Sequence, residues 1–149
     1  MTDRVLVDTN ILVYAHDPSA GKKNRQSIEI LDELRTSRTG VLSTQVVMEF
    51  VRAVTGRIPN PMSMKSAASQ ARIFLAAWPV VPITGIIVDE ALRGVIAHRL
   101  SLWDSQIWAT ARMNQIRSVL SEDFDHGTEI GGVRFRNPYR NGKEGKSQG

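Results

Sequence analysis

The sequence predicts an α/β protein, a three-layer sandwich in which a mainly parallel central sheet of four to five strands is flanked by helices. The first observation behind this prediction is that short apolar runs alternate with longer segments whose apolar residues recur at helical spacing. The second is that the strand runs are apolar throughout, which is typical of parallel strands covered on both faces. The third is that 149 residues, 42% of them hydrophobic, suit one domain with one core.

The elements follow one another with clear boundaries. Asp8-Thr9-Asn10 ends the first strand and caps a helix, Gly56 and Pro59 end the third helix, and Pro79 closes the fourth. Strands are expected at 5–7, 41–42, 80–81, 118–120 and, as a fifth, 133–135. Helices are expected at 11–15, 22–34, 44–54, 63–78, 86–100 and 103–113.

Composition excludes several classes of protein. There is no run of eighteen or more apolar residues and no signal-peptide pattern, so we expect no membrane span and a cytoplasmic location. The absence of cysteine excludes disulfides and thiolate metal sites. The net charge is +4, but residues 140–149 hold three basic residues and one acidic one, leaving sixteen basic against fourteen acidic elsewhere. We expect one domain at 1–139 and a disordered basic tail at 140–149.

Acidic side chains stand at positions that core packing does not explain. Asp8 and Asp123 each follow an apolar strand, and the carboxyl ends of parallel strands meet at one edge of a sheet. Glu49 shares a helix face with apolar residues, where a carboxylate is costly unless it is paired or binds a metal. Asp104 opens a helix between apolar residues. We expect these four carboxylates to converge on one site.

Each acid also has a purely structural alternative. Asp8 or Asp104 would serve as the N-cap of a helix. The run 121–127 is compatible with a solvated turn. Glu49 would pair with Arg52 on its own helix, although such pairs contribute only about 0.2–0.5 kcal/mol.

The sequence lacks the residue patterns that other common catalytic sites require. The three histidines, His16, His98 and His126, have no metal-ligand spacing and are expected on the surface. There is no phosphate-binding glycine loop and no Gly-x-Ser-x-Gly nucleophile motif. What remains is a site of oxygen ligands, which Mg²⁺ and Mn²⁺ prefer.

Taken together, the acidic segments resemble the motifs of PIN-domain ribonucleases. The last segment, with its Asn-Pro-aromatic ending, is similar to that of VapC-type toxins. One motif alone would be unspecific, whereas the ordered set across residues 4–139 is specific. The similar segments are 5–12, 43–50, 100–107, 120–127 and 132–139.

The resemblance implies a PIN-like nuclease domain at 1–139 that acts as the toxin of a type II toxin–antitoxin system. It implies hydrolysis of RNA by an endoribonuclease that depends on Mg²⁺ or Mn²⁺, a homodimer, and a VapB-type antitoxin whose C-terminal segment covers the active site. Catalytic and metal-binding roles fall on Asp8, Glu49, Asp104 and Asp123, with Asp125 as an auxiliary or substitute for Asp123 and with Thr9, Asn10 and Ser105 as supporting groups.

Two other functions stay open at this point. One is a DNA-directed, flap-type nuclease, which uses the same acidic chemistry, although the chain has no large inserted loops. The other is a catalytically weak RNA-binding or regulatory module that acts with its antitoxin. RNA would be held by arginines, which outnumber lysines fourteen to five. The candidates are Arg52, Arg57, Arg112 and Arg117, unless these are merely solvated helix faces.

Overall fold

A single six-stranded sheet forms the centre of the molecule. The computed structural model describes residues 3–140, so the tail expected at 140–149 lies outside the described range from residue 141 onward. The strand order is β3-β2-β1-β4-β6-β5, and neighbouring strands are parallel except β5 and β6. The strands are β1 Val5–Val7, β2 Gly40–Ser43, β3 Val80–Val81, β4 Ser118–Leu120, β5 Glu129–Ile130 and β6 Val133–Arg136.

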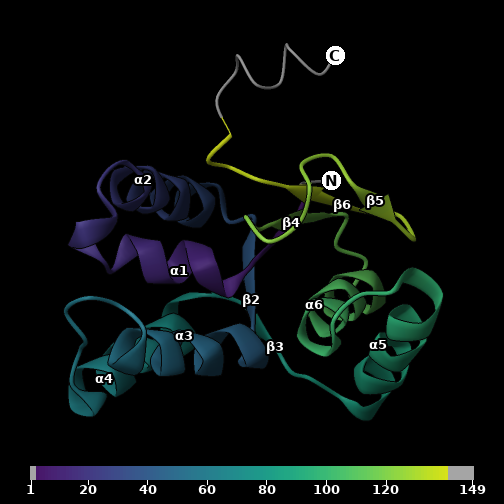
Figure 1. The fold of residues 1–149 in the computed structure, drawn as a ribbon, viewed down its shortest axis with the longest axis horizontal. Coiled ribbons are helices and arrows are strands. Elements are labelled where there is room, and N and C mark those ends of the chain that lie inside the picture. Colours follow the sequence, from purple (N-terminus) through teal and green to yellow (C-terminus); the bar gives the residue numbers. More distant parts are fainter. Residues whose placement is uncertain (1–2, 141–149) are drawn as a thin grey trace.

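Helices cover both faces of this sheet, as the sequence predicts. Figure 1 shows α1 to α4 on one side and α5 and α6 on the other. No helix within residues 3–140 is both long and apolar enough to cross a membrane. The helices are α1 Thr9–Ala15, α2 Lys22–Ser37, α3 Thr44–Gly56, α4 Met64–Ala77, α5 Gly85–His98 and α6 Leu102–Met113, with a short 3₁₀ helix, η1, at Pro18–Ala20.

The direction of the chain reverses beside β1. From β1 it proceeds to β2 and β3 on one side, and β4 then pairs with β1 on the other side. Since crossovers between parallel strands are right-handed, this reversal places α5 and α6 on the face opposite α1 to α4. The carboxyl ends of β1 and β4 therefore flank a switch point, the place where open α/β sheets bind ligands.

The core consists of the strands and the inner faces of the helices. Leu6, Val7 and Leu42 are fully buried, which confirms the prediction of strands covered on both faces. His16 departs from the expected surface position, because its ring packs edge-on against Phe50 and Phe74, with centroids 5.1 and 5.6 Å away. β5 was not predicted; it is a two-residue strand held only by its antiparallel pairing with β6.

Candidate active site

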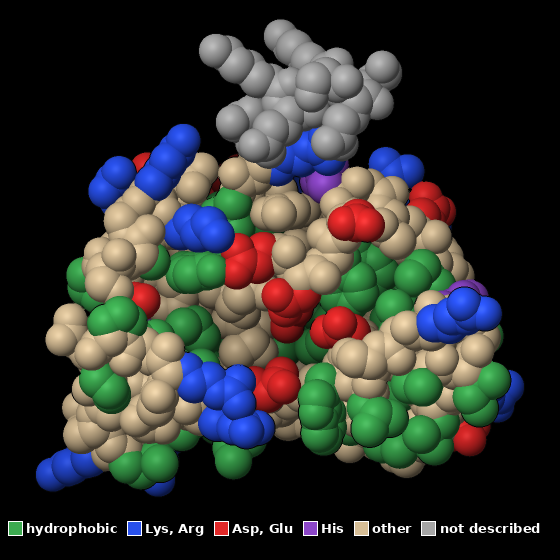
Figure 2. Space-filling model, viewed as in Figure 1, with side chains coloured by type: hydrophobic (Ala, Val, Ile, Leu, Met, Phe, Trp, Pro, Cys, Tyr) green, Lys and Arg blue, Asp and Glu red, His purple; other side chains and the backbone are tan. Residues whose placement is uncertain are grey.

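The four predicted carboxylates line one cavity of about 360 Å³ at the switch point. α1, α3, α6 and the turn after β4 form its walls. Figure 2 shows acidic side chains grouped in the hollow at the middle of this face, with basic side chains at its lower margin. The sequence prediction that Asp8, Glu49, Asp104 and Asp123 share one cavity therefore agrees with the structure.

Asp8 is the most deeply placed of the four, with 4% of its surface exposed. Its carboxylate caps α1 by accepting the Thr9 N–H at 2.7 Å, and it accepts the Ser121 hydroxyl at 2.7 Å. Burial raises the pKa of Asp8 to about 7; the two hydrogen bonds oppose this shift, and the nearby charges of Asp123 and Glu49 add to it. The carboxylate that caps α1 is therefore also one of the four that line the cavity.

Glu49 and Asp123 are oriented by polar groups from α1 and α3. The Thr9 hydroxyl donates to Glu49 Oε2 at 3.1 Å, and the Asn10 amide donates to Asp123 Oδ2 at 3.2 Å. Thr9 and Asn10, which were predicted as supporting groups, thus each contact one carboxylate of the site. Gln45 Nε2 also donates to Glu49 Oε2, at 3.3 Å.

Asp104 lies in the first turn of α6 and lines the same cavity. The N-cap alternative for Asp104 is wrong, because Ser101 caps this helix and accepts the Asp104 N–H at 3.1 Å. Partial burial raises the pKa of Asp104, hydrogen bonding of its carboxylate to the Ser101 side chain opposes this shift, and the charge of Asp123 adds to it. The Asp104 carboxylate is therefore left to face the cavity.

The donor chemistry of this cavity fits a hard divalent cation, although the side chains are not closed around a single point. Among the residues that the structure describes, no group of three or more acidic or histidine side chains is already arranged to hold an ion. Each of Asp8, Glu49 and Asp123 instead accepts hydrogen bonds from its neighbours. Burial raises the pKa of Asp8, and a cation bound beside it would favour the charged carboxylate.

Comparison with known proteins agrees with this architecture. The PIN domain family matches residues 5–127, which is most of the chain. The chain belongs to the PIN-domain family. No curated protein sequence matches it.

Solved structures with the same fold include toxins of toxin–antitoxin systems. A toxin–antitoxin complex from Klebsiella pneumoniae has 20% identity and a TM-score of 0.65, covering 92% of this chain and 99% of that one. VapC20 of Mycobacterium tuberculosis, a toxin that cleaves the sarcin–ricin loop, has 18% identity and a TM-score of 0.64, covering 87% and 98%. VapBC2 of Rickettsia felis, bound to a DNA fragment from its promoter, has 18% identity and a TM-score of 0.63, covering 89% and 97%.

Two other predicted residues of the PIN domain lie away from the cavity. Asp125 lines a neighbouring hollow that it shares with Asp123, but it does not line the cavity that also holds Asp8, Glu49 and Asp104. The Ser105 hydroxyl is buried and donates to the Ala91 carbonyl at 2.6 Å, where it joins α6 to α5. A supporting role for Ser105 at the acidic cavity is therefore wrong.

Two buried polar residues of the site were not predicted. The Ser121 hydroxyl, directly after β4, donates to Asp8 and accepts the Asp123 N–H at 3.0 Å. Gln45 accepts the Gln106 amide at 2.9 Å while donating to Glu49, so it links α3 to α6. The available signals were a serine directly after an apolar strand and a glutamine one turn before Glu49.

The four candidate arginines separate into two pairs. Arg52 and Arg57 line the cavity beside the acids. Arg112 instead donates to the Gly131 carbonyl at 2.8 Å, and Arg117 lies near the β5–β6 turn, outside the cavity. Among the described residues, Arg52 forms no ion pair with Glu49, so that alternative does not hold.

Proposed function

We propose that this PIN domain is an endoribonuclease that depends on Mg²⁺ or Mn²⁺ and acts as the toxin of a toxin–antitoxin pair. The observation that carries the proposal is the convergence of four carboxylates on one cavity at the switch point, with buried Asp8 at its base. Hard oxygen ligands of this kind select Mg²⁺ or Mn²⁺. The RNA-cleaving toxin among the solved structures of this fold supports RNA as the substrate.

Each side chain has a distinct part in the proposed reaction. Asp8 and Asp104 both line the cavity and would be the most direct ligands, while Glu49 and Asp123 would complete the shell or position a water molecule. When bound, the metal would supply positive charge toward the phosphate and make the attacking water more acidic. Thr9, through its hydroxyl, fixes the direction of the Glu49 carboxylate.

The first test is the removal of individual carboxylates. Asp8→Asn and Asp104→Asn should abolish metal-dependent cleavage, because an amide is a much poorer ligand for a hard cation. Asn is a good N-cap, so Asp8→Asn keeps the start of α1. Asp125→Asn, outside the cavity, is the matched control and should cleave as the wild type does.

The measurement is endonucleolytic cleavage of a panel of structured and unstructured RNAs with Mn²⁺, with Mg²⁺ and with EDTA. Cuts that require the metal and disappear in both variants support the proposal. Full activity in either variant would remove that carboxylate from the mechanism. No cleavage across the panel would favour the alternative of a regulatory module acting with its antitoxin. The structure of VapBC2 bound to promoter DNA supports considering this alternative.

The proposed role as a toxin also implies binding partners and a cellular location. We propose that the chain forms a homodimer in the cytoplasm and is neutralised by a VapB-type antitoxin whose C-terminal segment covers the acidic cavity. Support comes from solved toxin–antitoxin complexes that share the fold over nearly their whole length. Co-expression with the neighbouring gene product, followed by size-exclusion chromatography, would detect this complex.

A further inference from the structure

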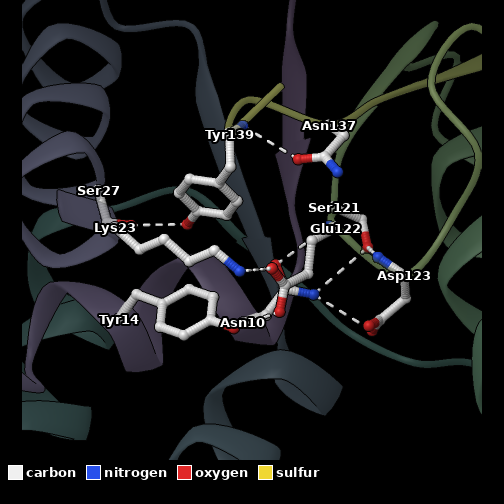
Figure 3. A network of polar contacts seen from close by, with 9 residues as sticks. All are labelled: Asn10, Tyr14, Lys23, Ser27, Ser121, Glu122, Asp123, Asn137 and Tyr139. Atoms are coloured by element: carbon white, nitrogen blue, oxygen red, sulfur yellow. Dashed lines mark hydrogen bonds and ion pairs between the residues drawn. The ribbon is translucent and has the colours of Figure 1, made fainter. Parts of the chain in front are cut away.

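The turn after β4 sends two neighbouring carboxylates in different directions. Asp123 lines the acidic cavity and accepts the Asn10 amide at 3.2 Å. Glu122 turns instead toward α1 and α2, where the Tyr14 hydroxyl donates to one of its oxygens and the Lys23 ammonium to the other, at 2.9 Å (Figure 3). Of these two adjacent acids, only one lines the cavity.

Lys23 is held from three segments of the chain. Its ammonium lies 5.0 Å from the centroid of the Tyr14 ring and 5.4 Å from that of Tyr139. The two rings meet edge to face, and the Tyr139 hydroxyl is hydrogen-bonded to buried Ser27 at 2.6 Å. Contacts between a cation and aromatic faces add to the ion pair with Glu122, so the position of the ammonium is well defined.

Asn10 connects the position of Glu122 to that of Asp123. Its side-chain oxygen accepts the Glu122 N–H at 3.4 Å, while its amide donates to Asp123. Figure 3 shows Asn10 between the two acids, beside Ser121. A change in the path of the chain at Glu122 is therefore transmitted to the carboxylate that lines the cavity.

We propose that Lys23 is a positioning residue of the acidic site: by pairing with Glu122 it holds the turn after β4 so that Asp123, and not Glu122, faces the cavity. This inference rests on the metal site of the proposed function. It concerns a lysine on α2 that does not line the cavity and that no acidic motif of the sequence includes.

The charge of Lys23 matters because the cavity already holds four carboxylates. The Glu122 side chain is 22% exposed, so water compensates its charge only in part. Without Lys23, the Glu122 carboxylate would lose the ammonium that pairs with it at 2.9 Å and would keep the Tyr14 hydroxyl as a donor. A fifth carboxylate free to rotate would repel Asp123 and compete with it for a cation.

Three variants of the full chain test this proposal. Lys23→Met keeps a long side chain across the tyrosine rings but removes the charge. Lys22→Met makes the same chemical change one position earlier, at an exposed residue that starts α2, and is the matched control. Lys23→Met combined with Glu122→Gln also removes the carboxylate that Lys23 holds.

The first readout is Mn²⁺ affinity, measured by isothermal titration calorimetry. We expect Lys23→Met to weaken Mn²⁺ binding about 10-fold, as is typical when a group that orients a metal ligand is lost. Lys22→Met should bind as the wild type does. The double variant should recover most of the lost affinity, because a neutral amide at position 122 neither repels Asp123 nor competes for the ion.

The second readout needs no metal. Amide hydrogen exchange of residues 121–124, measured in EDTA, should become faster in Lys23→Met and stay unchanged in Lys22→Met, because the turn loses its anchor. Wild-type exchange and wild-type Mn²⁺ affinity in Lys23→Met, with only a lower melting temperature, would assign Lys23 a purely structural role and overturn the proposal. Failure of the double variant to recover Mn²⁺ affinity would also contradict it.

The proposed function and the role of Lys23 can fail separately. If the wild type binds no Mn²⁺, the proposed function is wrong, and the positioning of Asp123 for a metal falls with it. If the wild type binds Mn²⁺ and Lys23→Met binds it equally well, the proposed function stands and the role of Lys23 is refuted.

Discussion

Asp8 combines a structural and a chemical role in one carboxylate. It caps α1 and is hydrogen-bonded to Ser121, yet burial raises its pKa to about 7. In the unfolded chain this group has its ordinary pKa of 3.8. Between these two values the folded protein keeps the Asp8 proton and the unfolded chain does not, so the contribution of Asp8 to stability falls as the pH rises through this window.

Asp8→Asn should therefore stabilise the metal-free protein, and more so at higher pH. One pKa unit corresponds to about 1.4 kcal/mol, so the gain in unfolding free energy should reach at most about 4 kcal/mol above pH 7 and should shrink toward pH 4. Urea denaturation in EDTA across this pH range measures it, with Asp125→Asn as the control. A difference between Asp8→Asn and wild type that does not change with pH would rule out ionisation of Asp8 as its cause.

The sequence predicted the acids of the site better than the groups that orient them. Asp8 and Asp123 could be placed because each follows a strand, and strand ends meet at one edge of a parallel sheet. Ser121 and Gln45 could not, because a hydroxyl or an amide is common at strand ends and helix faces whether or not it contacts a carboxylate. Ser105 was misplaced for the same reason: its hydroxyl bonds to α5 instead of facing the cavity.

At the scale of elements, α3 brings opposite charges to the same cavity. Glu49 lies one turn before Arg52 and Ala53 on this helix, and Arg57 follows its last residue. An RNA strand reaching the acids would therefore pass beside two guanidinium groups. Arginine is well suited to this place because its planar fork matches a phosphate.

Arg52→Ala and Arg57→Ala should each weaken RNA binding without disturbing the acidic cluster. We expect KM to rise about tenfold in either variant, with a smaller change in kcat, because a phosphate contact of this kind is made before and during the reaction. The dependence of binding on salt should also become shallower, by about one unit of log–log slope per arginine. Arg117→Ala, outside the cavity, should match the wild type in both measurements. Equal effects from all three variants would indicate only a general charge effect.

The packing of α5 on α6 depends on a single small residue. A Cβ added at Gly94 would lie 2.3 Å from the Ser105 hydroxyl and 2.7 Å from the Trp108 ring. The two helices therefore approach more closely than any other residue at position 94 would allow. Ser105, which Gly94 approaches, is the neighbour of Asp104 on α6, and Asp104 lines the cavity.

Gly94→Ala should destabilise the fold by about 1–3 kcal/mol, the usual cost of overpacking a core. Gly56→Ala is the matched control, because an added Cβ there meets nothing within 4 Å. We expect Gly56→Ala to be neutral or stabilising by up to about 1 kcal/mol. Chemical denaturation of both variants measures the difference, and equal stabilities would show that α5 shifts freely on α6.

At the scale of the whole molecule, alternation of elements was enough to predict the layers but not the strand order. Several helix starts carry a local signal, such as the serine caps of α3, α4 and α6. The pairing of β1 with β4 has none, because it joins segments more than 110 residues apart. β5 escaped prediction since its two residues have neither apolar run nor alternation, and its pairing with β6 defines it.

The pairing of β1 with β4 also determines when the site can form during synthesis. Asp8 is synthesised more than 110 residues before Ser121 and Asp123, which complete its surroundings. β4 cannot join β1 before then, so a partly made chain carries the first carboxylate without the hydroxyl and the acid that belong beside it. Whatever reaction the cavity performs, the order of translation delays it until nearly the whole domain has been made.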